Sequence, residues 1–214
     1  MTESPYRQGD HHEKSLTALL ISASILTSAN VIARDREISV EITNITNATY
    51  FTELLVAAHD RNTRLFELST AASPHLQAMA EGGNINGLID DLEAVGSEYI
   101  ANPAAGLLAP GASTEAVFNL PGNNHRFLSI VAMLLPTNDG FVGLNGLPVP
   151  KKKGTYIYYL RGYDAGTEAN DEIITGGDAP GVPGIPADPG GNTGTGGVAT
   201  VGPDHNPTIH IHRV

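Results

Sequence analysis

The positions of apolar residues predict a chain built mostly of short strands. In residues 37–44 every second position is apolar, which is the pattern of a strand with one solvated face. Residues 54–58 and 114–120 also favour strands. The predominantly apolar run at residues 128–135 predicts a central strand that is buried on both faces. Short strands separated by turn residues favour a β-sandwich over an alternating βα architecture.

Two helical patterns interrupt the strands. Ser73 and Pro74 are an N-cap and a proline at the first helical position, and the pair of glycines at 82–83 predicts the end of this helix. Asn86 is predicted to cap a second helix that ends before Gly96. The apolar residues on one face of this second helix are Leu88, Ile89, Leu92 and Val95. The pattern therefore predicts an all-β fold with a short helical insertion, arranged as an antiparallel β-sandwich.

The first 33 residues resemble a targeting segment. Residues 16–33 are uncharged, follow Lys14, and are followed at once by Arg34. We interpret residues 1–33 as a signal peptide or hydrophobic leader with cleavage after Ala33, which places the protein outside the cell, at the cell surface or in a periplasm. The alternative is an uncleaved membrane anchor, because an uncharged run of eighteen residues is just long enough to span a bilayer.

The C-terminal part of the chain changes composition. Residues 176–206 are rich in Gly, Pro, Ala and Thr, and are predicted to be a flexible loop after the domain at 34–175. Residues 207–214 alternate again and predict an edge strand on which His210 and His212 share a face. Two imidazoles on one face could bind a transition metal, but exposed polar positions are favoured because no third ligand is evident.

Composition narrows the classes of function. The 214 residues include 12 Lys+Arg and 23 Asp+Glu, and the net charge of −11 disfavours nucleic acid and other acidic partners. The chain has no cysteine, which excludes disulfides and thiolate chemistry. Aromatic residues make up 6% of the chain and tryptophan is absent, so a stacking platform for sugars would have few rings.

Three acidic residues are the candidates for chemistry. Asp139 lies in a loop after the strand at 128–135, Asp164 lies in a loop after an apolar run, and Glu168 follows four residues later. Carboxylates on loops at the ends of neighbouring strands could converge on Ca²⁺, which takes 6 to 8 oxygen ligands. Gly140 and Gly166 leave room there for backbone carbonyls and water. The alternative is that each is an ordinary turn residue that hydrogen-bonds to the nearby backbone.

The signals for catalysis are weak. His59, Asp60 and His125 could form an acid–base group, but no nucleophile motif or phosphate-binding glycine loop accompanies them. His59 is therefore predicted to be a hydrogen-bonded structural residue. The basic run at residues 151–153 is predicted to be a solvated hairpin tip, with contact to anionic lipid or polysaccharide as the alternative.

Several consecutive segments resemble the spondin domain family. The matching segments span residues 37–172 in the family's order, and the Asp-Ala-Gly-Thr-acid stretch is its most recognisable motif. They include LLVAAHDRNTRLFEL, ASPHLQAMAEGGNINGLIDDL, RFLSIVAMLLPTNDGFVGL and YDAGTEAN. The resemblance implies a β-sandwich similar to C2 domains, with Ca²⁺ held by Asp139, Asp164 and Glu168. The family's third acid is commonly Asp, so Glu168 departs from the pattern, and the cysteines of animal members are missing.

These observations predict a secreted, calcium-binding, non-catalytic module that acts in binding or adhesion. The expected partner is an extracellular protein or a polysaccharide, with no nucleic acid, and with a membrane only through an uncleaved leader. A metal-dependent hydrolase and a self-assembling surface protein are the alternatives.

Overall fold

The computed structural model describes residues 36–120, 124–169, 178–179, 182–186, 196–200 and 208–213. The predicted leader at residues 1–33 lies outside these residues, and its cleavage stays a prediction. No helix in the described ranges is both long and apolar enough to cross a membrane.

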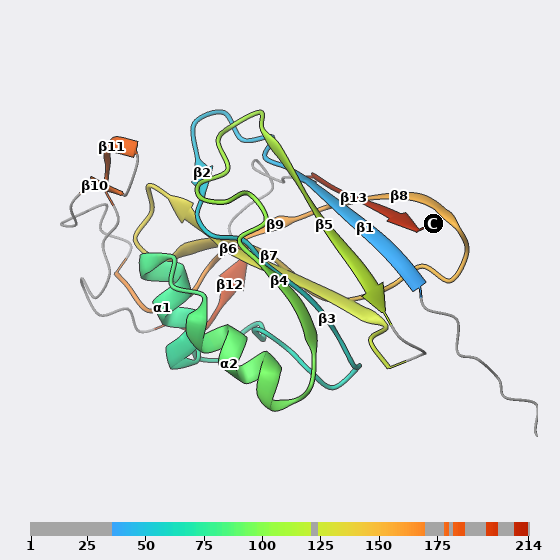
Figure 1. Cartoon of the computed structure of the whole chain (residues 1–214). Coiled ribbons are helices and arrows are strands. Elements are labelled where there is room, and N and C mark those ends of the chain that lie inside the picture. Colours follow the sequence, from blue (N-terminus) through green and yellow to red (C-terminus); the bar gives the residue numbers. More distant parts are fainter. Residues whose placement is uncertain are drawn as a thin grey trace, which may run out of the picture. The chain divides into compact units, whose positions relative to one another are not determined.

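Two antiparallel sheets form most of the domain (Figure 1). The four-stranded sheet has the order β5 (Ser113–Leu120), β1 (Arg36–Thr43), β13 (Thr208–Arg213) and β8 (Gly154–Tyr159). The seven-stranded sheet has the order β12 (Ala199–Thr200), β9 (Arg161–Asp164), β7 (Gly140–Pro148), β6 (Phe127–Leu135), β3 (Leu55–His59) and β4 (Glu98–Ala101), with β2 (Tyr50–Phe51) also paired to β6. Two short strands, β10 (Asp178–Ala179) and β11 (Val182–Pro186), pair with each other. The predicted all-β fold with a helical insertion is confirmed.

The apolar alternation of β1 places one of its faces in the core between the sheets. Ile38, Val40 and Ile42 are fully buried there, against residues of β5 and of the second sheet. The side chains on this face are expected to contribute about 1.5–3 kcal/mol each through removal from water. The sandwich therefore forms because each sheet has an apolar face that the other sheet covers.

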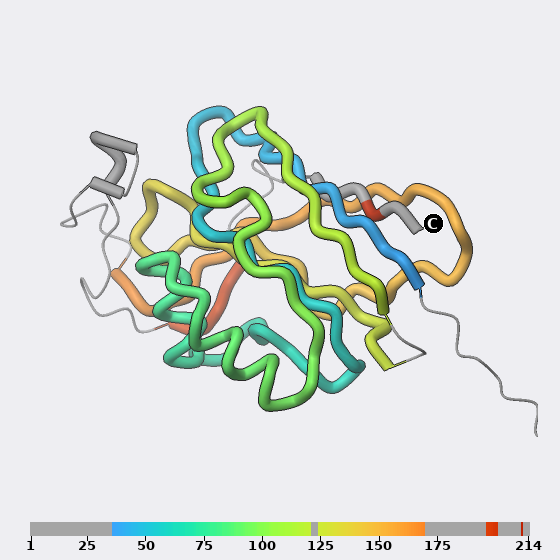
Figure 2. Tube along the Cα trace, viewed as in Figure 1, coloured from blue at the N-terminus to red at the C-terminus, as the bar shows by residue number. Residues whose placement is uncertain are grey.

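Strand β6 is buried on both faces, as predicted. Its Leu128, Ile130 and Ala132 face the core between the sheets, and Val131 and Met133 face a second core. The helices α1 (Pro74–Gly82) and α2 (Asn86–Ala94) cover this second core (Figures 1 and 2). A strand between two apolar layers has no solvated face, which explains its nearly continuous apolar sequence.

The predicted start of α1 is confirmed. The Ser73 side chain accepts a hydrogen bond from Leu76 N, and Gly83 ends the helix with φ 70°. The predicted cap of α2 is wrong. Residue Asn86 is already inside the helix, and the side chain of Asn84 accepts its backbone N–H at 3.1 Å instead.

The prediction for Val95 is also wrong. This residue follows the end of α2 and is 61% exposed, because the backbone leaves the helix at Val95 and turns the side chain away from the core.

The last strand is present, but the expectation of an edge position is wrong. Strand β13 lies between β1 and β8, with Ile211 opposite Val40 on one side and Tyr156 on the other. Ile211 is fully buried in the core between the sheets. Its alternation matches that of β1, so an inner position buries more apolar surface than an edge would.

The segment predicted as a flexible loop contains ordered strands in its described part. Strand β12 pairs with β9, and next to it Val198 is 2% exposed within the core under the helices. The backbone of Val198 also exchanges hydrogen bonds with Ser69 and Thr70. The buried valine and the paired backbone groups dock this part of the glycine-rich segment.

The basic run at 151–153 is solvated, but it is not a hairpin tip. It joins β7 to β8, and these strands belong to different sheets.

Candidate functional site

The loops that carry the three predicted calcium ligands meet at one corner of the larger sheet. Strands β7 and β9 are neighbours, and their register pairs Gly140 with Asp164. Asp139 precedes β7, and its backbone oxygen accepts a hydrogen bond from Ala165 N at 3.1 Å. The sequence positions 139, 164 and 168 are therefore brought into one corner.

Asp139 is the centre of this corner. The residue is buried, with 3% of its surface exposed. Its Oδ2 accepts hydrogen bonds from Thr167 N at 2.8 Å and Glu168 N at 3.0 Å. The Thr167 hydroxyl approaches the same oxygen at 3.3 Å. These bonds fix the turn after β9 to the loop before β7, so Asp139 has a structural role with or without a cation.

Asp164 and Glu168 differ in their surroundings. Asp164 is half-buried, and its Oδ1 accepts a hydrogen bond from Gly166 N at 2.6 Å. Glu168 is 4% exposed, so the corner holds two buried carboxylates, those of Asp139 and Glu168.

The two glycines of the corner are required for packing. Gly166 has φ 72°, and a Cβ there would lie 2.7 Å from the backbone of Gly196. A Cβ on Gly140 would lie 2.7 Å from the Thr137 hydroxyl oxygen. The space beside Gly166 is thus filled by the chain itself, whereas the sequence predicted room for coordinating water.

An aromatic pair supports the corner from inside the sheet. Phe141 and Tyr163 lie opposite each other on β7 and β9, and their rings stack with centroids 5.2 Å apart. Tyr163 directly precedes Asp164, and Phe141 follows Asp139 by two residues. The contact therefore holds the two acidic loops in register.

The donor chemistry of the corner fits a hard cation, since carboxylate oxygens are what Ca²⁺ prefers. Asp139 is in no ion pair with a basic residue among the described residues. However, no group of three His, Cys, Asp or Glu side chains in the described ranges is spaced to hold a metal ion. The residue types and burial fit calcium, while a ready-made three-carboxylate group is not assembled.

His59 is a buried structural residue, as predicted. It is fully buried, its Nδ1 lies 2.6 Å from the Asp60 backbone oxygen, and its Nε2 lies 2.7 Å from the Ser129 hydroxyl. The Ser129 oxygen also accepts a hydrogen bond from Gly146 N at 2.9 Å, beside the register shift between β6 and β7. Burial lowers the pKa of His59, with the charges of Arg64 and His125 acting in the same direction. Because Ser129 is fully buried as well, this Ser–His pair has no access to a substrate.

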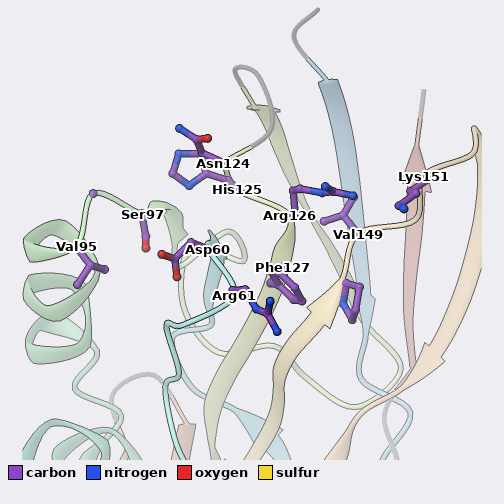
Figure 3. A pocket seen from close by; sticks show the side chains of 12 residues that line it. Asp60, Arg61, Val95, Ser97, Asn124, His125, Arg126, Phe127, Val149 and Lys151 are labelled. Atoms are coloured by element: carbon purple, nitrogen blue, oxygen red, sulfur yellow. The ribbon is translucent and has the colours of Figure 1, made fainter. Parts of the chain in front are cut away.

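The opposite end of β6 carries a feature that the sequence did not reveal. An open cleft of about 710 Å³ lies where β3 and β7 end and β6 begins (Figure 3). Its charged lining residues are Asp60, Arg61, Arg126 and Lys151. These positions come from three separate loops, and of their basic residues only the run at 151–153 was singled out by the sequence.

The C-terminal histidines lie on β13, next to an acidic position of β1. Position 210 lies opposite Glu41 on β1, and Glu41 lies opposite Glu115 on β5. The side chains of His210 and His212 are outside the described residues, so metal binding by these histidines stays a prediction.

The fold and the acidic corner define an antiparallel β-sandwich domain with a helical layer on one sheet. A family model described as Spondin_N matches residues 43–174, which include β2 to β9, both helices and all three candidate ligands. The chain belongs to the spondin domain family, and the predicted resemblance is confirmed. This is an extracellular type of domain. No curated protein matches the chain.

Proposed function

We propose that this protein is a secreted, non-catalytic binding or adhesion module whose acidic corner binds Ca²⁺ through Asp139, Asp164 and Glu168. The observation that carries the calcium proposal is the burial of Asp139 and Glu168 in the same corner, with Glu168 N bonded to Asp139 Oδ2. Ionised carboxylates that converge on one point repel each other, and a divalent cation would offset that repulsion.

Asp139 Oδ2 is committed to the backbone of the turn, so its other carboxylate oxygen is the one we assign to the ion. The Oδ1 of Asp164 already accepts the Gly166 N–H, so we assign its other carboxylate oxygen to the ion as well. Because the three carboxylates do not form a metal-binding group in the structure, calcium binding requires the Glu168 side chain to turn towards the two aspartates. Calcium would then lock together two loops that the backbone hydrogen bonds already hold.

The test is a calorimetric titration of the full chain with CaCl₂ after treatment with a chelator. We expect binding by the wild type and none by the Asp139→Asn, Asp164→Asn double variant. At a calcium concentration one hundred times Kd, binding should add about 2.7 kcal/mol of stability. For a domain of this size that raises Tm by about 5–10 °C.

Asparagine is the suitable replacement because it keeps a side-chain oxygen for the backbone N–H groups. The matched control is Asp90→Asn, Glu98→Gln, which removes two carboxylates from exposed positions. A Glu168→Gln variant tests the third ligand separately. Equal heats of binding in the wild type and in the Asp139→Asn, Asp164→Asn variant would reject the calcium site.

One observation favours a second candidate, self-assembly through an edge strand. Among the described strands β8 pairs only with β13, and its Ile157 and Tyr159 are 57% and 65% exposed. An uncovered edge with apolar side chains is a template for a second copy of the chain. Light scattering of the wild type and of Ile157→Lys separates this candidate, since a dimer formed through β8 would be lost in the variant.

A further inference from the structure

The cleft at the start of β6 concentrates positive charge in an acidic protein. Six of the chain's 12 lysines and arginines lie in it or next to it: Arg36, Arg61, Arg126, Lys151, Lys152 and Lys153. Within the described residues, the three that line the cleft are in no ion pair with an acidic side chain. Cations without acidic partners in a concave site are available to an anionic ligand.

The cleft lies far from the acidic corner. Strand β6 begins at the cleft with Phe127 and ends at Leu135, just before the loop of Asp139. At about 3.3 Å per residue the nine residues of β6 separate the two sites by roughly 25–30 Å. This exceeds the screening length at physiological salt, so the acids of the corner do not cancel the basic cleft.

The other side of the cleft has a different chemistry. Figure 3 shows Asp60 and Ser97 on the side next to the end of α2, with Arg126 and Lys151 on the opposite side. Asp60 Oδ1 accepts hydrogen bonds from Asn62 N at 2.8 Å and Thr63 N at 3.0 Å. These backbone bonds lower the pKa of Asp60 and keep its carboxylate ionised. An ionised carboxylate, a hydroxyl and the Asn124 amide are suited to the hydroxyl groups of a ligand.

Apolar side chains complete the cleft. Val95 is 61% exposed and lines it together with Phe127 and Val149. The Val95 side chain does not pack in the core and instead forms part of the apolar wall of the cleft. A ligand that fits this lining carries anionic groups, hydroxyl groups and patches of C–H surface.

We propose that this cleft binds an acidic polysaccharide, with its carboxylate or sulfate groups on Arg61, Arg126 and Lys151 and its hydroxyl groups on Asp60, Ser97 and Asn124. A guanidinium binds a planar carboxylate or a sulfate through two parallel hydrogen bonds, which gives the site its direction. The proposal rests on the binding role proposed above, but it does not rest on the calcium site. It also departs from the expectation that a net charge of −11 disfavours acidic partners, because a ligand in the cleft meets the local charge first.

A polysaccharide fits this cleft better than the surface of an anionic membrane. A membrane is broad and requires a convex or flat basic surface, whereas these cations line a concave site. Asp60 would face anionic headgroups directly and would repel them. The same carboxylate favours a ligand that alternates charged groups with hydroxyls.

The experiment measures equilibrium binding of the full chain to heparin, to polygalacturonate and to neutral dextran. Heparin tests sulfate groups and polygalacturonate tests carboxylate groups. We expect binding to at least one of the two acidic polymers and none to dextran. Arg61→Gln and Arg126→Gln should each weaken binding by about tenfold, which corresponds to the loss of one charge-assisted hydrogen-bonded contact.

The matched control is Arg161→Gln, which removes the same charge from an exposed position of β9 outside the cleft and should change binding by less than about twofold. Asp60→Asn is the sharpest variant. Attraction of polyanions by charge alone would make this variant bind more tightly, whereas loss of a hydroxyl acceptor in a specific site makes it bind more weakly.

Three outcomes would overturn the proposal: no binding to either acidic polymer, equal losses for Arg161→Gln and Arg126→Gln, or tighter binding by Asp60→Asn. Vesicles of anionic lipid that bind in place of the polymers would assign the cleft to a membrane and reject the saccharide. Repeating the measurement in chelator separates the two sites. Binding that persists in the Asp139→Asn, Asp164→Asn variant would support the cleft even if the calcium proposal fails.

Discussion

Replacing Ser129 by alanine tests the buried polar network that joins β3, β6 and β7. The backbone oxygen of Asp60 can only accept, so His59 Nδ1 carries the proton and Nε2 is an acceptor that faces the Ser129 hydroxyl, which also lies 3.1 Å from a second acceptor, Asn145 Oδ1. The Ser129 oxygen in turn accepts the N–H of Gly146. One hydroxyl therefore satisfies a histidine nitrogen on one strand and a backbone donor on another.

The expected magnitude follows from these contacts. The alanine variant leaves His59 Nε2 and Gly146 N without their partner, and each unsatisfied buried group costs about 1–3 kcal/mol. We expect a loss of about 2–6 kcal/mol, a large fraction of the 5–15 kcal/mol that typically stabilises a domain. Tm should fall by about 5–20 °C.

Urea unfolding of the full chain, followed by circular dichroism, measures this loss. The matched control is Ser113→Ala, another serine on a strand. Residue Ser113 is exposed, and its hydroxyl lies 2.8 Å from the Thr43 hydroxyl. The control should change stability by less than about 0.5 kcal/mol. Equal effects in Ser129→Ala and Ser113→Ala would refute the role of the buried network.

The same network predicts a pH dependence. Burial lowers the pKa of His59 below its ordinary value of 6.5, so the unfolded chain takes up a proton at a higher pH than the folded chain does. Stability is therefore full above pH 6.5 and falls as the pH drops from 6.5 towards the folded-state pKa. Urea unfolding at several pH values measures how the free energy of unfolding changes with pH. This change should be smaller for His59→Gln than for the exposed control His75→Gln, and equal changes in the two variants would contradict the role of His59.

Two further predictions concern the backbone. Gly166→Ala should destabilise the domain by more than Gly96→Ala. Both positions have positive φ, but only at Gly166 would the added Cβ meet backbone, 2.7 Å from that of Gly196. Similar Tm values for the two variants would contradict this packing. Ser73→Ala should cost about 1 kcal/mol in urea unfolding, because the serine side chain caps α1 by accepting from Leu76 N, and Ser73→Asp should retain most of the stability; equal losses in both variants would argue against capping.

The acidic corner shows both what sequence can predict and where it stops. The resemblance to the spondin family pointed to two acidic loops, and the structure brings Asp139, Asp164 and Glu168 to one corner. The sequence could not reveal that Asp139 Oδ2 already binds the backbone of the turn, or that Gly196 fills the space beside Gly166. These contacts join residues from different parts of the chain, and they depend on the packing of both.

The sequence by itself determined the local elements. The alternation in 37–44, the Ser73 cap and the apolar run of β6 each fix a strand or a helix, because side-chain period and capping act within a few residues. The position of β13 between β1 and β8 and the basic cleft were decided only by the tertiary structure. The order of the strands and the meeting of distant loops depend on the total apolar surface that the whole fold buries. A short stretch of sequence does not determine this total.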